Sequence, residues 1–209
     1  MIYVTHHVSG TQDAQALRDA ILRKSRESAR TSVDFFQDNA ERIQSLACAM
    51  SERFAQGGRL FVMGNGGSSC DAEHVAVEFM HPILEKRKAL PSISLSAGSA
   101  LLTAISNDHD FSRVYAVQLR NLAQSKDMVL AISTSGTSPN LVYALQEAKK
   151  LGLLTAAFCG KDGGRVKDVA DWSLIVPSFS IHRIQETHVV LLHVLWDTIH
   201  LVMGEEDIV

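Results

Sequence analysis

The stretch STSGTS, residues 133–138, gathers hydroxyl side chains around one glycine directly after an apolar run at residues 128–132. Such a run predicts a buried strand, and open α/β sheets bind ligands outside the carboxyl ends of their strands. Serine and threonine donate hydrogen bonds without adding charge, and a helix that starts here would direct backbone N–H groups at an anion. The pattern therefore predicts a phosphate-binding loop. The candidate residues are Ser133, Thr134, Ser135 and Ser138.

A plainer explanation exists for part of this loop. Ser138 stands where a serine caps the amino end of a helix, and Pro139 suits the first helical position. One cap needs one hydroxyl, however, and this loop supplies several. We therefore favour phosphate binding over capping as the reason for the cluster.

A second polar loop, GNGGSS at residues 64–69, follows the apolar run at residues 59–63. Its glycines would let the backbone approach a ligand closely. The spacing matches neither GxGxxG nor a P-loop, so the sequence predicts neither a dinucleotide site nor a Walker-type nucleotide site.

Two helical stretches carry residues that bind metals or transfer protons. His74 and Glu78 are four residues apart after the second loop, which places both side chains on one helix face. Gln185, His188 and His193 lie in the apolar stretch RIQETHVVLLH. These residues could share a metal ion or a substrate atom. A surface hydrogen bond for the first pair, and satisfied core histidines for the others, are the alternatives.

Short apolar runs alternate with helical stretches from residue 59 onward, which predicts a doubly wound parallel sheet covered by helices on both faces. Residues 11–57 carry no strand-like run, and their apolar spacing predicts two helices. We therefore expect an N-terminal helical segment, 1–57, which packs on the body or on other subunits, and one α/β unit, 58–209. The expected strands are 59–63, 92–95, 128–132, 154–159 and 173–176, and the expected later helices are 68–80, 98–106, 112–124, 139–151 and 183–203.

The composition excludes several classes of protein. A formal net charge of −3 gives no basic excess for nucleic acid, and no apolar run has the length of a membrane span. The N-terminus lacks the pattern of a signal peptide. Three widely spaced cysteines argue against a disulfide framework and against a CxxC metal site. We expect a cytoplasmic protein with reduced thiols.

Together the motifs resemble the phosphoheptose isomerases of the sugar-isomerase (SIS) domain family, over roughly residues 40–203. The motifs in order are GNGGSSCDAEHVAVE (64–78), Asn107-Asp108, STSGTS, GKDGG (160–164) and RIQETHVVLLH (183–193). The resemblance implies a five-stranded parallel sheet between helices. It also implies a homotetramer with active sites at subunit contacts.

The resemblance further implies which residues act. Glu78 and His193 would transfer protons as sedoheptulose 7-phosphate is converted through an enediol to D-glycero-D-manno-heptose 7-phosphate, a step in heptose precursor biosynthesis, and zinc would assist. The implied zinc ligands are His74, Glu78, Gln185 and His193. The implied substrate-binding residues are Asn65, Gly66, Gly67, Glu78, Asn107, Asp108, Ser133, Thr134, Ser135, Ser138 and Gln185.

Two other functions stay open at this point. Pro82 and Leu84 stand where the family often has arginines, and His182 replaces a common aspartate, so the substrate could be another phosphosugar. A non-catalytic SIS module that binds a phosphosugar or a protein partner is the second alternative. The presence of both Glu78 and His193 weighs against that module.

Overall fold

The computed structural model describes residues 11–82 and 87–207 of the chain. The first residues of the predicted N-terminal segment, 1–10, lie outside this part, as does Leu84.

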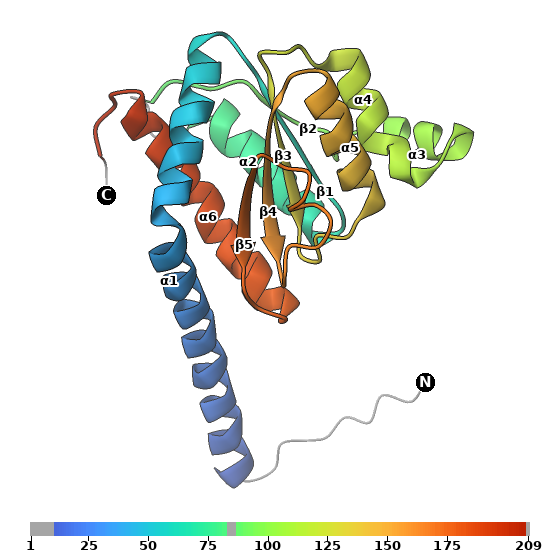
Figure 1. The fold of residues 1–209 in the computed structure, drawn as a ribbon. Coiled ribbons are helices and arrows are strands. Elements are labelled where there is room, and N and C mark those ends of the chain that lie inside the picture. Colours follow the sequence, from blue (N-terminus) through green and yellow to red (C-terminus); the bar gives the residue numbers. More distant parts are fainter. Residues whose placement is uncertain (1–10, 83–86, 208–209) are drawn as a thin grey trace.

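A five-stranded sheet with the order β2-β1-β3-β4-β5 forms the centre of the molecule (Figure 1). All four neighbouring pairs are parallel, which confirms the predicted sheet. The strands are β1 (Leu60–Gly64), β2 (Ser92–Ser94), β3 (Met128–Ser133), β4 (Leu154–Gly160) and β5 (Trp172–Val176).

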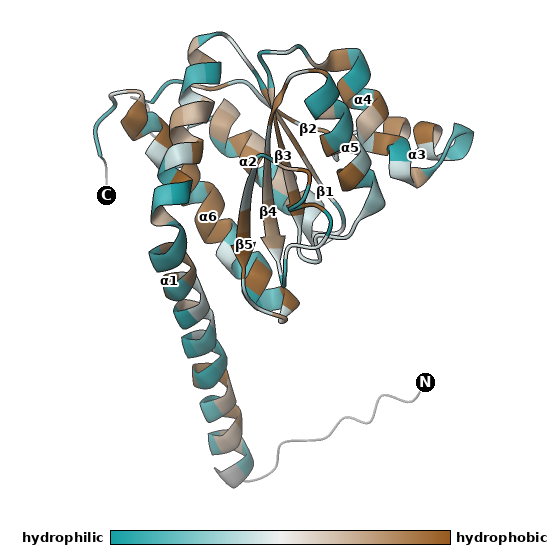
Figure 2. Cartoon of the chain, in the orientation of Figure 1, coloured by the Kyte–Doolittle hydropathy of each residue, from teal (hydrophilic) through white to brown (hydrophobic). Residues whose placement is uncertain are grey.

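Helices cover both faces of the sheet, because successive strand residues point to opposite sides. Val62 and Leu130 face a core shared with α1, α2 and α6, whereas Phe61 and Val129 face a core shared with α3, α4 and α5. Figure 2 shows the strands in the brown of apolar residues and much of the outer helix surface in teal. The later helices are α2 (Gly67–Met80), α3 (Ser99–Asp108), the 3₁₀ turn η1 (Phe111–Arg113), α4 (Val114–Leu122), α5 (Pro139–Lys150) and α6 (Ile181–Val202).

The prediction of two N-terminal helices was wrong. One helix, α1 (Thr11–Ala55), runs through the whole region for 45 residues. The polar middle of this region separates its two apolar groups, but it contains no glycine or proline that would end a helix. The second half of α1 packs on α6 and β5, while its first half extends beyond the body (Figure 1).

The strand order places a topological switch between β1 and β3. The chain winds from β1 outward to β2 and then returns past β1 to β3, so the connections diverge at the carboxyl ends of these two strands. Open α/β sheets bind ligands in the crevice at such a point. In the described part of the chain, no helix combines the length and apolarity needed to cross a membrane.

Candidate functional site

The glycine loop (residues 64–69) and the serine loop (residues 133–138) both begin at this switch point, because β1 pairs with β3 over its full length. An amide pair joins the two regions. Asn65 Nδ2 donates to Asn140 Oδ1 over 3.0 Å, and Asn140 Nδ2 donates back to Asn65 Oδ1 over 2.8 Å. The reciprocal bonds fix the orientation of both amides. Asn65 therefore connects the glycine loop to the first turn of α5, directly after the serine loop.

Two further residues donate hydrogen bonds to the start of the glycine loop. Tyr115, buried on α4, donates a hydrogen bond to the carbonyl of Gly64, and Ser96 Oγ donates to the same oxygen over 3.1 Å. Burial raises the pKa of the Tyr115 hydroxyl, which therefore stays protonated and able to donate. The sequence analysis missed Asn140, Tyr115 and Ser96. Asn140 follows the serine loop directly and could have been found, whereas no local pattern marks the other two.

The serine loop has the features that an anion site requires. Gly136 has a positive φ of 64°, and its N–H donates to Ser133 Oγ over 3.0 Å. Ser138 occupies the N-cap position of α5, as the alternative explanation required, but its side chain makes no capping hydrogen bond. Its hydroxyl is thus free for another partner. Ser135 Oγ accepts from the Thr137 hydroxyl over 3.0 Å and retains its own hydrogen for donation.

A cavity of about 410 Å³ opens beside these loops. We call it the switch-point cavity. Its lining residues are Asn65, Asp110, Phe111, Ser112, Ser138, Pro139 and Asn140. This volume lies within the range of small-molecule sites.

A separate group of three side chains forms where α2 and α6 meet. His74 Nε2 lies 3.3 Å from Glu78 Oε1, and His193 Nε2 lies 3.3 Å from His74 Nε2. His193 Nε2 is also 4.0 Å from Glu78 Oε1. We call these residues the His-Glu-His cluster. The structure therefore brings together three of the four predicted metal ligands.

The geometry of the cluster fits a metal ion. Ligands held tetrahedrally about 2.0–2.1 Å from zinc lie about 3.3–3.4 Å apart, which matches two of the three separations. The nitrogens of His74 and His193 face each other, and a shared cation would satisfy the lone pairs of both. All three ligand atoms lie within 4.8 Å of one another. Two imidazoles and one carboxylate form a suitable donor set for zinc and leave a coordination position open.

Gln185, the fourth predicted ligand, lies against the first turn of α2. A Cβ atom added to Gly67 would come within 2.4 Å of Gln185 Nε2, so the absence of a side chain at Gly67 makes room for this amide. Among the described residues, no hydrogen bond joins Gln185 to the His-Glu-His cluster. Its role as a ligand remains a prediction.

Asn107 and Asp108 lie in the last turn of α3, where both are exposed. Asn107 Nδ2 donates to Asp108 Oδ1 over 2.9 Å. No hydrogen bond within the described ranges connects them to the other predicted site residues. Asp110 and Phe111, just beyond them, do line the switch-point cavity. The contact of Asn107 and Asp108 with substrate therefore stays a prediction.

His188 is a core residue, as one of the alternatives proposed. Its side chain is fully buried, and its Nε2 lies 3.1 Å from the carbonyl oxygen of Cys159. Burial lowers the pKa of His188 to about 4, so the imidazole is neutral at physiological pH. Nothing in this arrangement directs it toward the cluster or the cavity.

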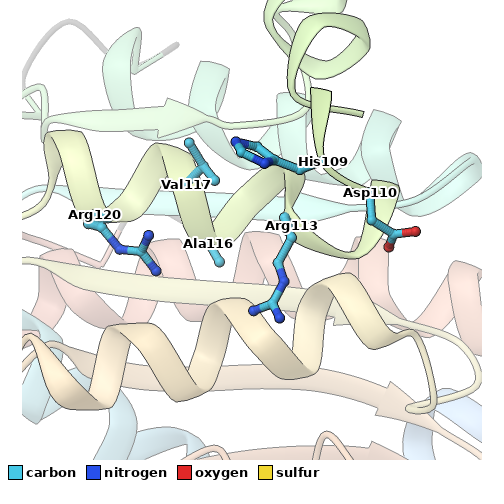
Figure 3. Close-up of a pocket in the computed structure, with 6 residues that line it drawn as sticks. All are labelled: His109, Asp110, Arg113, Ala116, Val117 and Arg120. Carbon is cyan, nitrogen blue, oxygen red and sulfur yellow. The ribbon is translucent and has the colours of Figure 1, made fainter. Parts of the chain in front are cut away.

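A second cavity of about 390 Å³ shares Asp110 with the switch-point cavity, and Figure 3 shows the residues that line it. Arg113 and Arg120 line it and point toward α5 (Figure 3). The Arg113 guanidinium stacks over the Tyr143 ring at 4.4 Å, and Arg120 Nε pairs with Glu147 over 3.0 Å. Both cations therefore have partners on α5, and packing of α4 against α5 accounts for them.

Comparisons with known proteins agree with this architecture. The model of the SIS domain family matches residues 25–160. A phosphoheptose isomerase of Thermodesulfovibrio yellowstonii is 39% identical over 189 residues, which cover 90% of this chain and 94% of that protein.

Solved structures give the same result. A phosphoheptose isomerase from Neisseria gonorrhoeae has a TM-score of 0.82 and 32% identity, covering 88% of this chain and 98% of the other. One from Francisella tularensis has a TM-score of 0.84 and 32% identity, covering 88% and 97%.

Proposed function

The chain belongs to the SIS-domain family, and within it to the phosphoheptose isomerases, so it is a phosphosugar isomerase; we propose that it converts sedoheptulose 7-phosphate to D-glycero-D-manno-heptose 7-phosphate. The reaction moves a proton between C1 and C2 through an enediol and supplies heptose precursors. It needs a base at carbon and an acid at oxygen. The observation that carries the proposal is the convergence of a carboxylate and two imidazoles from α2 and α6.

The serine loop binds the phosphate in this proposal. Ser133, Thr134, Ser135 and Ser138 surround the ester with hydroxyls at the amino end of α5, where the helix dipole favours an anion. Support comes from the Ser138 hydroxyl, which occupies the cap position without capping the helix. Asn65, Gly66 and Gly67 line the sugar from the glycine loop, and Asn107 with Asp108 contacts it from α3.

Glu78 acts as the base at carbon and His193 as the acid at oxygen. The two oxygens of Glu78 have different surroundings, which supports this division of roles. Oε1 faces His74 at 3.3 Å, whereas Oε2 makes no hydrogen bond to any residue in the described ranges. One oxygen can therefore hold the cluster together while the other accepts a proton. A carboxylate bound through both oxygens would be a weaker base.

Zinc is the proposed cofactor, with His74, Glu78, Gln185 and His193 as its ligands. When bound, zinc would supply a Lewis acid beside the substrate carbonyl. His74 then orients Glu78, because the two side chains are one helical turn apart on α2.

We propose a homotetramer in which subunit contacts complete the sites. Four apolar residues within three positions of Glu78 or His193 are exposed: Val77 (58%), Met80 (53%), Val190 (41%) and Val194 (37%). Exposed apolar side chains that gather in one region of a surface commonly mark a protein contact. The outer half of α1 adds exposed Leu17 and Ile21.

The proposed location is the cytoplasm. The three cysteines are all free, as expected in a reducing compartment.

The test is turnover of sedoheptulose 7-phosphate by the purified protein with zinc, beside a panel of other ketose phosphates. Glu78→Gln should lower kcat by about 10²–10⁴-fold and leave phosphosugar binding intact. Glu73→Gln makes the same change at an exposed position on the same helix and should have no effect. Faster turnover of another ketose phosphate than of sedoheptulose 7-phosphate would identify that sugar as the substrate instead. Absence of turnover on every member of the panel would refute the isomerase reaction.

A further inference from the structure

The GKDGG loop (residues 160–164) follows β4 and packs directly against the serine loop. Val166 N–H donates to the carbonyl of Gly136 over 2.8 Å. A Cβ atom at Gly136 would lie 2.0 Å from the carbonyl oxygen of Gly163, so the two backbones touch. The GKDGG loop therefore supports the serine loop from the side of β4.

Lys161, the second residue of this loop, has an unusual backbone. Its φ of 58° is the only positive value for a non-glycine residue in the described part of the chain. A lysine has no intrinsic preference for this left-handed conformation, and such residues cluster at functional sites. The N–H of Lys161 donates to the carbonyl of Ser178 over 3.1 Å, which holds the residue in place between the ends of β4 and β5.

The strand register places Lys161 beside the serine loop. Ser133 pairs with Cys159, so the two chains run side by side into their loops. A Cβ atom at Gly160 would lie 2.6 Å from the carbonyl oxygen of Thr134, which shows that this closeness continues past the last pair. Lys161 is the next residue, level with Ser135. Its backbone thus stands at the ligand edge of the sheet, next to the hydroxyls.

The charges around Lys161 leave its ammonium group available. Lys161 is half-buried and forms no ion pair with the residues that the structure describes. Asp162, its neighbour, accepts a hydrogen bond from Gly164 N–H over 3.1 Å. The nearby Lys167 is engaged, because its Nζ donates to the Asp162 carbonyl over 2.6 Å. Of Lys161 and Lys167, only Lys161 lacks an ion pair or a side-chain hydrogen bond among the described residues.

The serine loop contains no cationic side chain. A phosphate monoester carries about −1.5 to −2 charges at pH 7, whereas hydroxyls and backbone amides are neutral. Asp110 adds a carboxylate to the wall of the switch-point cavity. Lysine commonly binds phosphate as a point charge on a flexible four-carbon stem.

We propose that Lys161 binds the substrate phosphate and supplies the positive charge that the serine loop lacks. This inference rests on the proposed function, since it concerns the same phosphosugar. The GKDGG loop, whose backbone touches the serine loop, places Lys161 at the ligand edge of the sheet. The lysine thereby selects phosphorylated sugars over neutral ones.

Four variants separate charge from backbone geometry. Lys161→Met removes the charge, Lys161→Arg keeps it, and Lys161→Gly removes it while relieving the backbone strain. Lys167→Met, three residues after the loop, is the matched control. A charge-assisted hydrogen bond corresponds to roughly 10–100-fold in affinity. We expect the KM for sedoheptulose 7-phosphate to rise by that factor in Lys161→Met and Lys161→Gly, with kcat nearly unchanged.

The other readouts distinguish a binding role from a structural one. Lys161→Arg should recover most of the affinity, and Lys167→Met should match the wild type. The wild-type KM should rise with salt, and this dependence should flatten in Lys161→Met. Lys161→Gly should melt at a higher temperature than Lys161→Met, because glycine accepts a positive φ.

A wild-type KM in Lys161→Met would overturn the proposal. So would equal KM values for Lys161→Arg and Lys161→Met, since the loss would then come from geometry. If the wild type turns over no phosphosugar, the proposed function fails separately. Calorimetric titration with inorganic phosphate then decides on Lys161, with weaker binding by Lys161→Met expected and equal binding refuting its role.

Discussion

Acid should destabilise this protein in part through the buried imidazole of His188. The side chain is fully buried and donates at most one hydrogen bond, to the carbonyl of Cys159. Burial lowers its pKa from 6.5 to about 4, because the charged form loses its hydration. The unfolded chain therefore binds a proton at a higher pH than the folded chain does. Stability should fall as the pH drops from 6.5 toward 4, and this contribution should level off below that range.

The size of the loss follows from the shift. A difference of 6.5 − 4 = 2.5 pKa units corresponds to about 3 kcal/mol at about 1.4 kcal/mol per unit. That is a large share of the roughly 5–15 kcal/mol that stabilises a typical protein. His188→Gln has no group that titrates in this range, and its amide can still donate to the Cys159 carbonyl.

Urea unfolding between pH 4 and pH 8 measures how the free energy of unfolding depends on pH. The protein concentration is held fixed, and metal is removed by a chelator. The difference in free energy of unfolding between wild type and His188→Gln should change by about 3 kcal/mol across the window, with the wild type losing more. A difference that stays constant with pH would show that His188 is not held neutral by burial.

Three further predictions concern the loops and the assembly. Ser138→Ala should raise the KM for the phosphosugar by roughly 5–10-fold and leave thermal stability unchanged, whereas a lost helix cap would lower stability instead. Asn140→Ala removes a buried amide and leaves the half-buried amide of Asn65 without its partner, which should lower the free energy of unfolding by about 1–3 kcal/mol in urea denaturation; an unchanged value would argue against the amide pair. Leu17→Asp combined with Ile21→Asp should dissociate the proposed tetramer in sedimentation experiments, and an unchanged mass would show that this face of α1 lies outside the subunit contacts.

The sheet could be predicted because its strands are apolar on both faces. Runs such as residues 128–132 have no polar alternation, which fits a parallel sheet with a helix layer on each side. The length of α1 was missed for a related reason. The first half of α1 is mostly exposed in this chain and has little apolar periodicity. The apolar pattern is therefore interrupted although the helix continues.

The site was predictable where its residues come from contiguous motifs. His74 and Glu78 share one helix face, so their spacing predicts their contact. His193 joins this pair because α6 packs against α2. The residue spacing within either helix does not predict how the two helices pack. Tyr115 reaches the Gly64 carbonyl across 51 positions of sequence, and no short pattern predicts such a contact. The left-handed φ of Lys161 is likewise visible only in the structure.

The most direct test of Glu78 as the base measures proton exchange at a carbon of the substrate. Wild-type protein incubated with sedoheptulose 7-phosphate in D₂O should exchange a carbon-bound hydrogen for deuterium, as observed by NMR, because an enediol forms and is reprotonated. Glu78→Gln should bind the phosphosugar and exchange nothing. Exchange by Glu78→Gln at the wild-type rate would contradict the assignment of Glu78 as the base.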